Sequence, residues 1–282
     1  MMQSVVSELP LAFFSTLGPI GAGTFAAISF ALFTCDDRVC RMKLGTWGLL
    51  PFAFAVVGLL GAFVHLGDAL HAPFALTGVA SSPLSQEICA ALAFLIAAAA
   101  CIVACRIGKE GSSAAKWSAV IAAVVGIVFA VFVGKAYMVD TITSWNTPLS
   151  VIEPVGACLF GGAALGALVV TAAGVCADKK VLGVVVVAGG VVFAIALVAH
   201  VFTVSGMASR LVDGAQLAAN VMPLCVVSCV LVAIAIMCTV AWAKSSQAGM
   251  PLIAVILACS VLGVFAGRLV FYGLQLSGGL CL

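Results

Sequence analysis

Eight long apolar stretches run through this sequence of 282 residues, and they constrain its fold more than any other feature. A helix needs about 20 mostly apolar residues to cross the hydrocarbon core of a bilayer, and each stretch supplies them. Lipid offers no hydrogen bonds to an open backbone, and the stretches lack the alternation of a membrane barrel. The predicted fold is therefore all-α, a polytopic membrane protein with helices near residues 9–33, 47–66, 85–106, 117–139, 149–175, 181–205, 217–243 and 250–276.

The composition excludes a soluble protein and a nucleic-acid-binding one. Hydrophobic residues make up 65% of the sequence and charged residues 8%, whereas a globular domain carries roughly 25% charge. The net charge of +2 is too small for a basic patch that binds nucleic acid.

Most cysteines lie within apolar stretches, so we expect buried thiols. No C-x-x-C pair occurs, so no iron-sulfur cluster or other metal is expected in this protein.

The basic residues alternate between the predicted loops. Those of the odd-numbered loops are Arg38, Arg41, Lys43, Arg106, Lys109, Lys116, Lys179, Lys180 and Lys244. The second and fourth loops have none, and the sixth has only Arg210. The positive-inside rule then predicts that the odd loops are cytoplasmic and that both termini face outward. Trp117 and Trp145 fall at predicted span ends, where we expect them to anchor at the lipid headgroups.

An offset of 135 residues aligns the two halves of the sequence. The matched positions are Pro19 with Pro154 in the pattern P-x-G-A, His65 with His200, and Tyr137 with Tyr272. The protein has only three histidines and two tyrosines, so a match of such scarce residues favours a repeat. We predict two four-helix transmembrane repeats of the same topology, residues 1–140 and 141–282. Gly161, Gly162 and Gly166 predict close helix packing in the fifth span.

Three charged or titratable residues lie within spans at one depth, toward the outer face: His65, Glu87 and Arg268. A charge inside a span costs roughly 2.5 to 3.5 kcal/mol on insertion scales, so each is a candidate for function. Each also has a structural interpretation. A histidine near a span end can bond a backbone carbonyl, and Glu87 can complement a helix N-terminus. Arg268 needs a partner, for which Glu87 and Glu153 have suitable depths.

A histidine, a carboxylate and an arginine at one depth suit the oxidation of a lipid-soluble quinol. A quinol that loses two electrons also loses two protons. An imidazole can deprotonate one hydroxyl, a carboxylate can pass protons to water, and a cation can stabilise the developing anion. We expect His65, Glu87 and Arg268 to take these roles in a pocket between the second, third and eighth spans.

Several motifs resemble those of the DmsC family, the membrane anchors of dimethyl sulfoxide reductase type complexes. Residues 65–69 (HLGDA) with 82–88 (SPLSQEI) are similar to the family's H-L-G and S-x-L-S-x-E motif. Residues 267–274 (GRLVFYGL) resemble its G-R-x-x-F-Y-G-L ending of the last span. Tyr137, Asp140, Thr141, Trp145, Thr147 and Pro148 are similar to its fourth outer loop. The resemblance covers essentially the whole sequence.

The resemblance implies a three-subunit complex in the bacterial cytoplasmic membrane, with a molybdopterin catalytic subunit, an electron-transfer subunit with four iron-sulfur clusters, and this anchor. Family anchors oxidise menaquinol and contain no haem. His65 and Glu87 carry over directly as residues of the quinol site. Arg268 and Tyr272 match the last-span motif, and their contact with quinol is our inference. We also expect His71 to contact the quinol. With Pro73 after it, this stretch departs from the family pattern, in which a basic residue is expected near His71.

Other functions remain open on the sequence alone. His65 and His200 occupy equivalent positions in the two halves and could ligate one haem b. Repeats with glycine-broken helices also occur in transporters, although these bind solutes at the midplane. A purely structural anchor would keep the fold without the chemistry. The terminal electron acceptor is a property of the catalytic subunit and is not encoded in this sequence.

Overall fold

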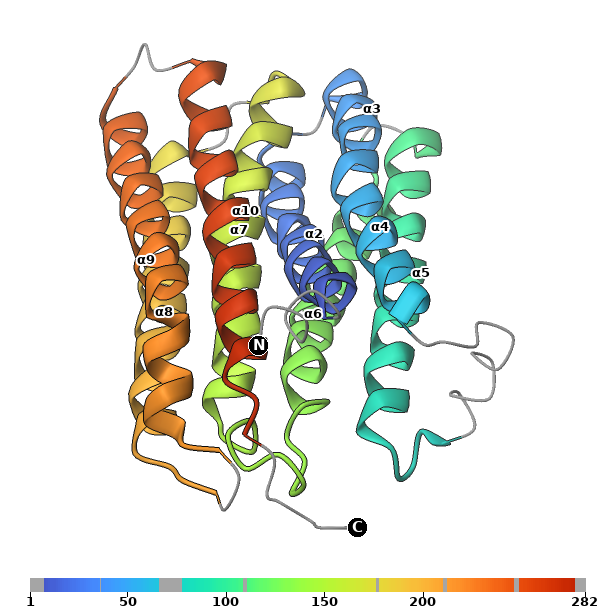
Figure 1. Ribbon diagram of the computed structural model, residues 1–282. Coiled ribbons are helices and arrows are strands. Elements are labelled where there is room, and N and C mark those ends of the chain that lie inside the picture. The colour runs from blue at the N-terminus through green and yellow to red at the C-terminus, as the bar shows by residue number, and fades with distance from the viewer. Residues whose placement is uncertain are drawn as a thin grey trace.

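The structure of the protein, a computed structural model, describes residues 8–35, 37–65, 78–108, 111–175, 178–209, 212–245 and 249–276, with the backbone alone for residues 64 and 65. Figure 1 shows long helices standing side by side. Within the described ranges they are α2 (Leu9–Thr34), α3 (Arg38–Trp47), α4 (Leu49–His65), α5 (Pro83–Ile107), α6 (Ser113–Lys135), α7 (Leu149–Ala172), α8 (Lys179–Ser205), α9 (Gly214–Lys244) and α10 (Met250–Gly273).

The described residues confirm the all-α fold and the eight spans. Eight helical segments are long and apolar enough to cross a membrane, with α3 and the following α4 counted as one. Outside the helices, the described residues form no strand longer than an isolated bridge between Ala208 and Asp213. The ends of the predicted spans differ from those of the helices by a few residues, because the first and last turns are more polar than the span centres.

Helix α3 was not expected, because its ten residues are too few and too polar for a span. The Asp37 side chain caps its N-terminus by accepting a hydrogen bond from the backbone N–H of Cys40 at 3.2 Å. Arg41 is buried, and its guanidinium donates to the carbonyl oxygens of Cys105 and Gly108. These carbonyls lie at the C-terminal end of α5, where the helix leaves acceptors unsatisfied. Arg41 therefore joins α3 to α5.

The fourth span ends at Lys135, four residues before the predicted residue 139, and a turn-rich segment follows. Hydrogen bonds hold this segment, residues 136–148, against α10. Trp145 donates from Nε1 to the Phe271 carbonyl oxygen at 3.0 Å, and Ser144 Oγ accepts from the Leu276 N–H at 2.9 Å. Trp145 is buried, so its predicted place at the headgroups is wrong. Trp117 is 61% exposed, as a headgroup anchor requires.

Helices α2 and α7 pack closely at the centre of the molecule and are the two most buried spans. A Cβ atom added to Gly23 would overlap the carbonyl oxygen of Cys158, and one added to Gly162 would lie 2.6 Å from the Cα of Gly23. Gly166 packs in the same way against Ala27. The predicted packing role of the small residues in the fifth span is confirmed, because only glycine permits this approach.

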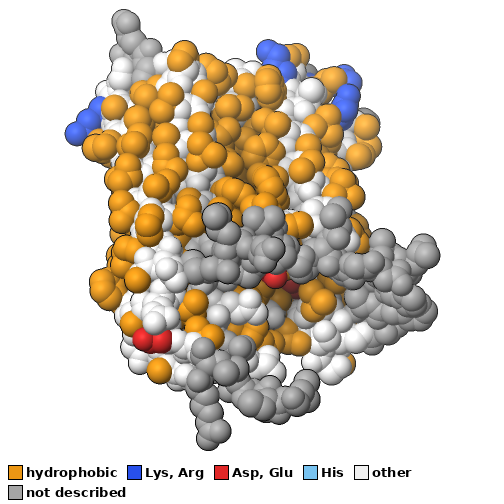
Figure 2. Space-filling view, viewed as in Figure 1, with side chains coloured by type: hydrophobic (Ala, Val, Ile, Leu, Met, Phe, Trp, Pro, Cys, Tyr) orange, Lys and Arg blue, Asp and Glu red, His pale blue; other side chains and the backbone are white. Residues whose placement is uncertain are grey.

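The two ends of the bundle differ in charge. Figure 2 shows lysine and arginine side chains at one end of the molecule, beyond a broad apolar surface. We call the end that holds α3 and the N-terminus of α8 the basic end. The opposite end holds residues 136–148 and 206–209, and it is the end that the positive-inside rule predicts to face outward.

Candidate functional site

An apolar cavity of about 310 Å³ lies toward the opposite end, among α2, α4, α5 and the segment after α6. Its lining residues are Leu11, Phe14, Leu59, Ala62, Leu84, Glu87, Ile88, Ala136 and Tyr137. The volume is at the lower end of the range for small-molecule pockets, which are mostly apolar with a few placed polar groups. Here the polar side chains are Glu87 and Tyr137. Helix α10 does not line this cavity, which differs from the predicted pocket between the second, third and eighth spans.

Glu87 is a buried carboxylate with an unpartnered oxygen among the described residues. It lies in the second turn of α5, after the N-cap Ser82, whose Oγ accepts from the Ser85 N–H at 3.3 Å. The side chain is 4% exposed, and no described hydrogen-bond donor contacts Oε1. A carboxylate that only complemented the helix N-terminus would be expected to face water. A buried acceptor without a hydrogen bond is energetically costly. Oε1 therefore has the environment of an atom that hydrogen-bonds to a bound ligand.

The two tyrosines of the protein meet beside this cavity. Their hydroxyl oxygens are 2.7 Å apart, and the Tyr272 hydroxyl is also 3.2 Å from Ser15 Oγ. The Tyr137 ring packs edge-on against Trp145 and Phe271, which stack on each other with centroids 5.2 Å apart. Burial raises the pKa of the Tyr137 phenol well above its ordinary value, and the neighbouring Tyr272 raises it further. Tyr137 is therefore a neutral hydroxyl that can donate or accept one hydrogen bond.

Arg268 lies behind the tyrosines, with no exposed surface. Its Nε donates to Ser15 Oγ at 2.9 Å, and one terminal nitrogen donates to Glu153 Oε2 at 3.4 Å. The guanidinium carbon lies 4.1 Å from the centre of the Phe271 ring and 5.7 Å from that of Tyr137. Its other terminal nitrogen has no hydrogen-bond partner among the described residues. Of the two partners that the sequence offered, the structure places Glu153 in contact.

Glu153 also binds His200, which is equally buried. Glu153 Oε1 is 2.7 Å from His200 Nδ1, and His200 Nε2 is 2.8 Å from the Ser144 carbonyl oxygen. A carbonyl oxygen can only accept, so Nε2 carries a proton. One further proton lies between Nδ1 and the carboxylate. The structure thus joins α2, α7, α8, α10 and the 136–148 segment through one buried polar cluster. We call it the Glu153 cluster, and its members are Ser15, Ser144, Glu153, His200 and Arg268.

The Glu153 cluster does not fit the haem interpretation. A bis-histidine haem needs a ring nitrogen with a free lone pair on each histidine. Both nitrogens of His200 already face oxygen acceptors inside the protein. In this structure His200 therefore has no ring nitrogen left for a haem iron.

The structure brings together some of the predicted site residues. Arg268 and Tyr272 lie in one contact network, and Tyr137 connects that network to the cavity that holds Glu87. His65 is the last residue of α4, and its side chain lies outside the described part of the structure, as does the whole of His71. Ala62 lines the cavity, and the backbone of residue 65 follows it by three positions along one face of the helix.

Sequence reasoning missed the roles of Ser15, Ser144 and Tyr137. A serine within an apolar helix, such as Ser15, usually bonds its own backbone and gives no separate signal. Ser144 lies in the 136–148 segment, outside the helices. The sequence does carry a signal for Tyr137, because the offset of 135 pairs it with Tyr272. In the structure the hydroxyls of these two tyrosines are in contact. No group of three or more metal-ligating side chains occurs among the residues that the structure describes.

Comparisons with known proteins agree with the fold. The family described as "DMSO reductase anchor subunit (DmsC)" matches residues 2–274. The sequence is 27% identical to the C subunit of the anaerobic dimethyl sulfoxide reductase of Escherichia coli K12, over 99% of both proteins. It is 22% identical to the YnfH subunit of an anaerobic dimethyl sulfoxide reductase of the same organism, over 98% of this protein and 97% of that one. It is 27% identical to the corresponding C subunit of Haemophilus influenzae over 53% of each.

The family match covers nearly the whole sequence, and eight helices long enough to span a bilayer agree with a membrane anchor. This protein belongs to the DmsC family of dimethyl sulfoxide reductase anchor subunits, and it is a multi-pass membrane anchor.

Proposed function

We propose that this anchor binds menaquinol in the cavity beside Glu87, oxidises it, and passes the electrons to an iron-sulfur subunit in anaerobic respiration. The observation that carries the proposal is the buried Glu87 carboxylate, which has an unpartnered oxygen in the wall of an apolar cavity. An apolar ring system with hydroxyl groups on its edge complements such a cavity. The relatives' names refer to anaerobic dimethyl sulfoxide reductase, and the sequence motifs resemble those of the family's quinol site.

The reaction removes two electrons and two protons from menaquinol and leaves menaquinone. His65 accepts one hydroxyl proton, and Glu87 accepts the other and relays protons to the outer face. The positive charge of Arg268 stabilises the anion that forms when the first proton leaves. Tyr137 donates a hydrogen bond to the quinol oxygen, and Tyr272 holds the Tyr137 hydroxyl in place.

The electrons leave this protein for a partner. They pass to the nearest cluster of a four-cluster iron-sulfur subunit and then to a molybdopterin catalytic subunit. In this assignment the site lies near the extracytoplasmic face of a bacterial cytoplasmic membrane, and the partners dock there. The anchor itself contributes proton acceptors and a lipid-accessible cavity, and it holds no haem or iron-sulfur cluster.

The test uses the whole complex in membranes. Glu87→Gln and His65→Ala should each lower the rate of menaquinol-analogue oxidation by about 100-fold, the lower range for loss of a general base. An artificial soluble electron donor that reduces the partner subunits directly should support normal turnover in both variants. The matched control is Gln86→Glu, which places a carboxylate one position earlier at a partly exposed site. Normal quinol oxidation by the Glu87→Gln complex contradicts the proposal.

A further inference from the structure

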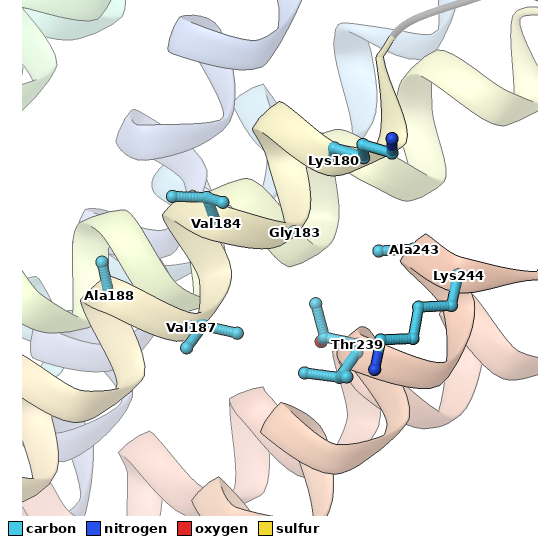
Figure 3. A pocket seen from close by; sticks show the side chains of 9 residues that line it. Lys180, Gly183, Val184, Val187, Ala188, Thr239, Ala243 and Lys244 are labelled. Carbon is cyan, nitrogen blue, oxygen red and sulfur yellow. The ribbon is translucent and has the colours of Figure 1, made fainter.

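A second groove lies at the basic end, far from the Glu87 cavity, on the outer surface between α8 and α9. Its volume is about 690 Å³, and its lining residues are Lys180, Gly183, Val184, Val187, Ala188, Thr239, Val240, Ala243 and Lys244. Figure 3 shows the two helices as its walls. Val184 is 66% exposed and Val240 is 40% exposed, so the groove opens on the surface that the membrane surrounds.

Small residues form the floor of the groove, and its length is apolar. A Cβ atom added to Gly183 would lie 3.3 Å from that of Ala243, so the helices are separated here by little more than backbone. The Thr239 hydroxyl donates to the Ala235 carbonyl oxygen of its own helix at 2.7 Å. It is therefore not free to donate to a ligand. Below the lysines the groove offers methyl and methylene surface that suits a hydrocarbon chain.

Two lysines lie on opposite walls of the groove, near the basic end. Figure 3 shows Lys180 at the start of α8 and Lys244 on α9, whose side chain extends along the groove toward Thr239. Across the described part of the protein, neither side chain takes part in an ion pair. The nearby Asp178 caps α8 by accepting from the Lys180 backbone N–H at 2.8 Å. Lys179 is already engaged, because its Nζ lies 3.5 Å from the Ser245 carbonyl oxygen and 5.7 Å from the centre of the Trp242 ring.

We propose that this groove binds an anionic phospholipid, with the headgroup phosphate between Lys180 and Lys244 and one acyl chain along the groove. The occupant must carry negative charge at the level of the helix ends and hydrocarbon below it. A phospholipid of the adjacent leaflet has both parts at the required depths. Lysine side chains near a membrane surface attract anionic lipids in this way. The proposal is independent of quinol chemistry and concerns how the bundle selects its lipid shell.

The test is native mass spectrometry of the full-length protein in detergent, titrated with phosphatidylglycerol or with phosphatidylcholine of the same acyl chains. The wild-type protein should bind phosphatidylglycerol more tightly. Lys180→Gln/Lys244→Gln should weaken phosphatidylglycerol binding by about 30-fold, which corresponds to about 1 kcal/mol for each lysine. The same variant should leave the weaker phosphatidylcholine binding unchanged.

Two further variants separate the groove from general surface charge. Arg38→Gln/Lys43→Gln removes two exposed charges from the same end, away from the groove, and should change phosphatidylglycerol binding less than twofold. Ala188→Phe fills the groove from an exposed position and should weaken binding of both lipids. Circular dichroism melting checks that each variant is folded.

Three results would overturn the proposal. Equal losses in the groove and control double variants would mean that surface charge alone attracts the lipid. Displacement of the lipid by millimolar inorganic phosphate would mean that the lysines bind a free anion without the acyl chain. A change of oligomeric state in Ala188→Phe, with lipid binding intact, would mean that the groove receives a second copy of the protein.

Discussion

Glu153 contacts two buried side chains, the cationic Arg268 and the proton-bearing His200. Both interactions depend on the negative charge of Glu153. All three side chains have no exposed surface. Buried ion pairs add little net stability as a unit, because desolvation offsets the attraction. Removal of one partner is different, since it leaves an uncompensated charge in a medium of low dielectric constant.

We predict that Glu153→Ala lowers the free energy of unfolding by about 3 to 5 kcal/mol, because Arg268 keeps its charge without a counterion. The measurement is reversible unfolding of the purified protein in detergent by titration with sodium dodecyl sulfate. The double variant Glu153→Leu/Arg268→Leu should lose clearly less stability than the sum of the losses in Glu153→Leu and in Arg268→Leu. The exposed Asp140→Asn at the same end serves as the control. Additive losses would contradict the coupling.

The Tyr137 phenol should resist ionisation. In Tyr272→Phe, Tyr137 is the only remaining tyrosine, so absorbance at 295 nm reports on it alone. Burial is the largest cause of its raised pKa and remains in this variant. An ordinary phenol is half ionised near pH 10, whereas the folded variant should show almost no tyrosinate there. The pKa of Tyr137 is higher in the folded state than in the unfolded state. Its contribution to the free energy of unfolding is therefore complete below about pH 10 and decreases as the pH rises further.

Some of these residues could be identified from the sequence, but the contacts between them could not be predicted. Arg268 stood out because an arginine in a span needs a counterion, and Glu153 was one of two candidates. The choice between Glu87 and Glu153 depends on the rotation of α5 and α7 about their axes, which hydropathy does not reveal. Nothing in the sequence indicated that Trp145 would turn inward and stack on Phe271.

At the scale of elements, the close approach of α2 and α7 sets the position of the Glu153 cluster. Gly162 and Gly23 allow backbone contact between the helices, which brings Ser15 of α2 within reach of Arg268. Helix lengths and order were predictable from hydropathy, because each span must cross the same hydrocarbon thickness. Helix α3 was not, because its stability derives from the contact of Arg41 with the end of α5.

We expect Gly162→Leu to destabilise the protein by more than about 3 kcal/mol, beyond the usual cost of overpacking, because the obstacle is the backbone of α2. The same detergent unfolding experiment measures it. Gly206→Leu is the matched control, since the nearest atom to its added Cβ would be the Thr203 carbonyl oxygen at 3.7 Å. Equal stability of the two variants would contradict the proposed role of the glycine packing.

At the scale of the molecule, the charge difference between the two ends predicts the orientation in the membrane. Reporter fusions measure this orientation directly. Alkaline phosphatase, which is active only outside the cytoplasm, should be active when fused after Asn146 and inactive when fused after Gly111. The reverse pattern would place the Glu87 cavity near the cytoplasmic face and contradict the predicted orientation.

We propose that the two halves are repeats that diverged in function. Residue 222 matches Glu87 at the offset of 135, and it is Met222. It lines an apolar groove of about 340 Å³ between α8 and α9 that also contains Cys225 and Phe202. His200, which matches His65, is held by Glu153 instead. The second half thus has a comparable hollow without a carboxylate, so in this proposal only the hollow of the first half can accept protons from quinol.

The most direct measurement is photolabelling of the purified complex with a photoreactive menaquinone analogue, followed by peptide mapping. We predict labelling of residues from α4, α5 or the Tyr137 segment. Ala62→Trp, which fills the Glu87 cavity, should abolish this labelling, whereas Ala233→Trp in the Met222 groove should preserve it. Labelling confined to α8 and α9, or unchanged labelling in Ala62→Trp, would contradict a quinol site beside Glu87.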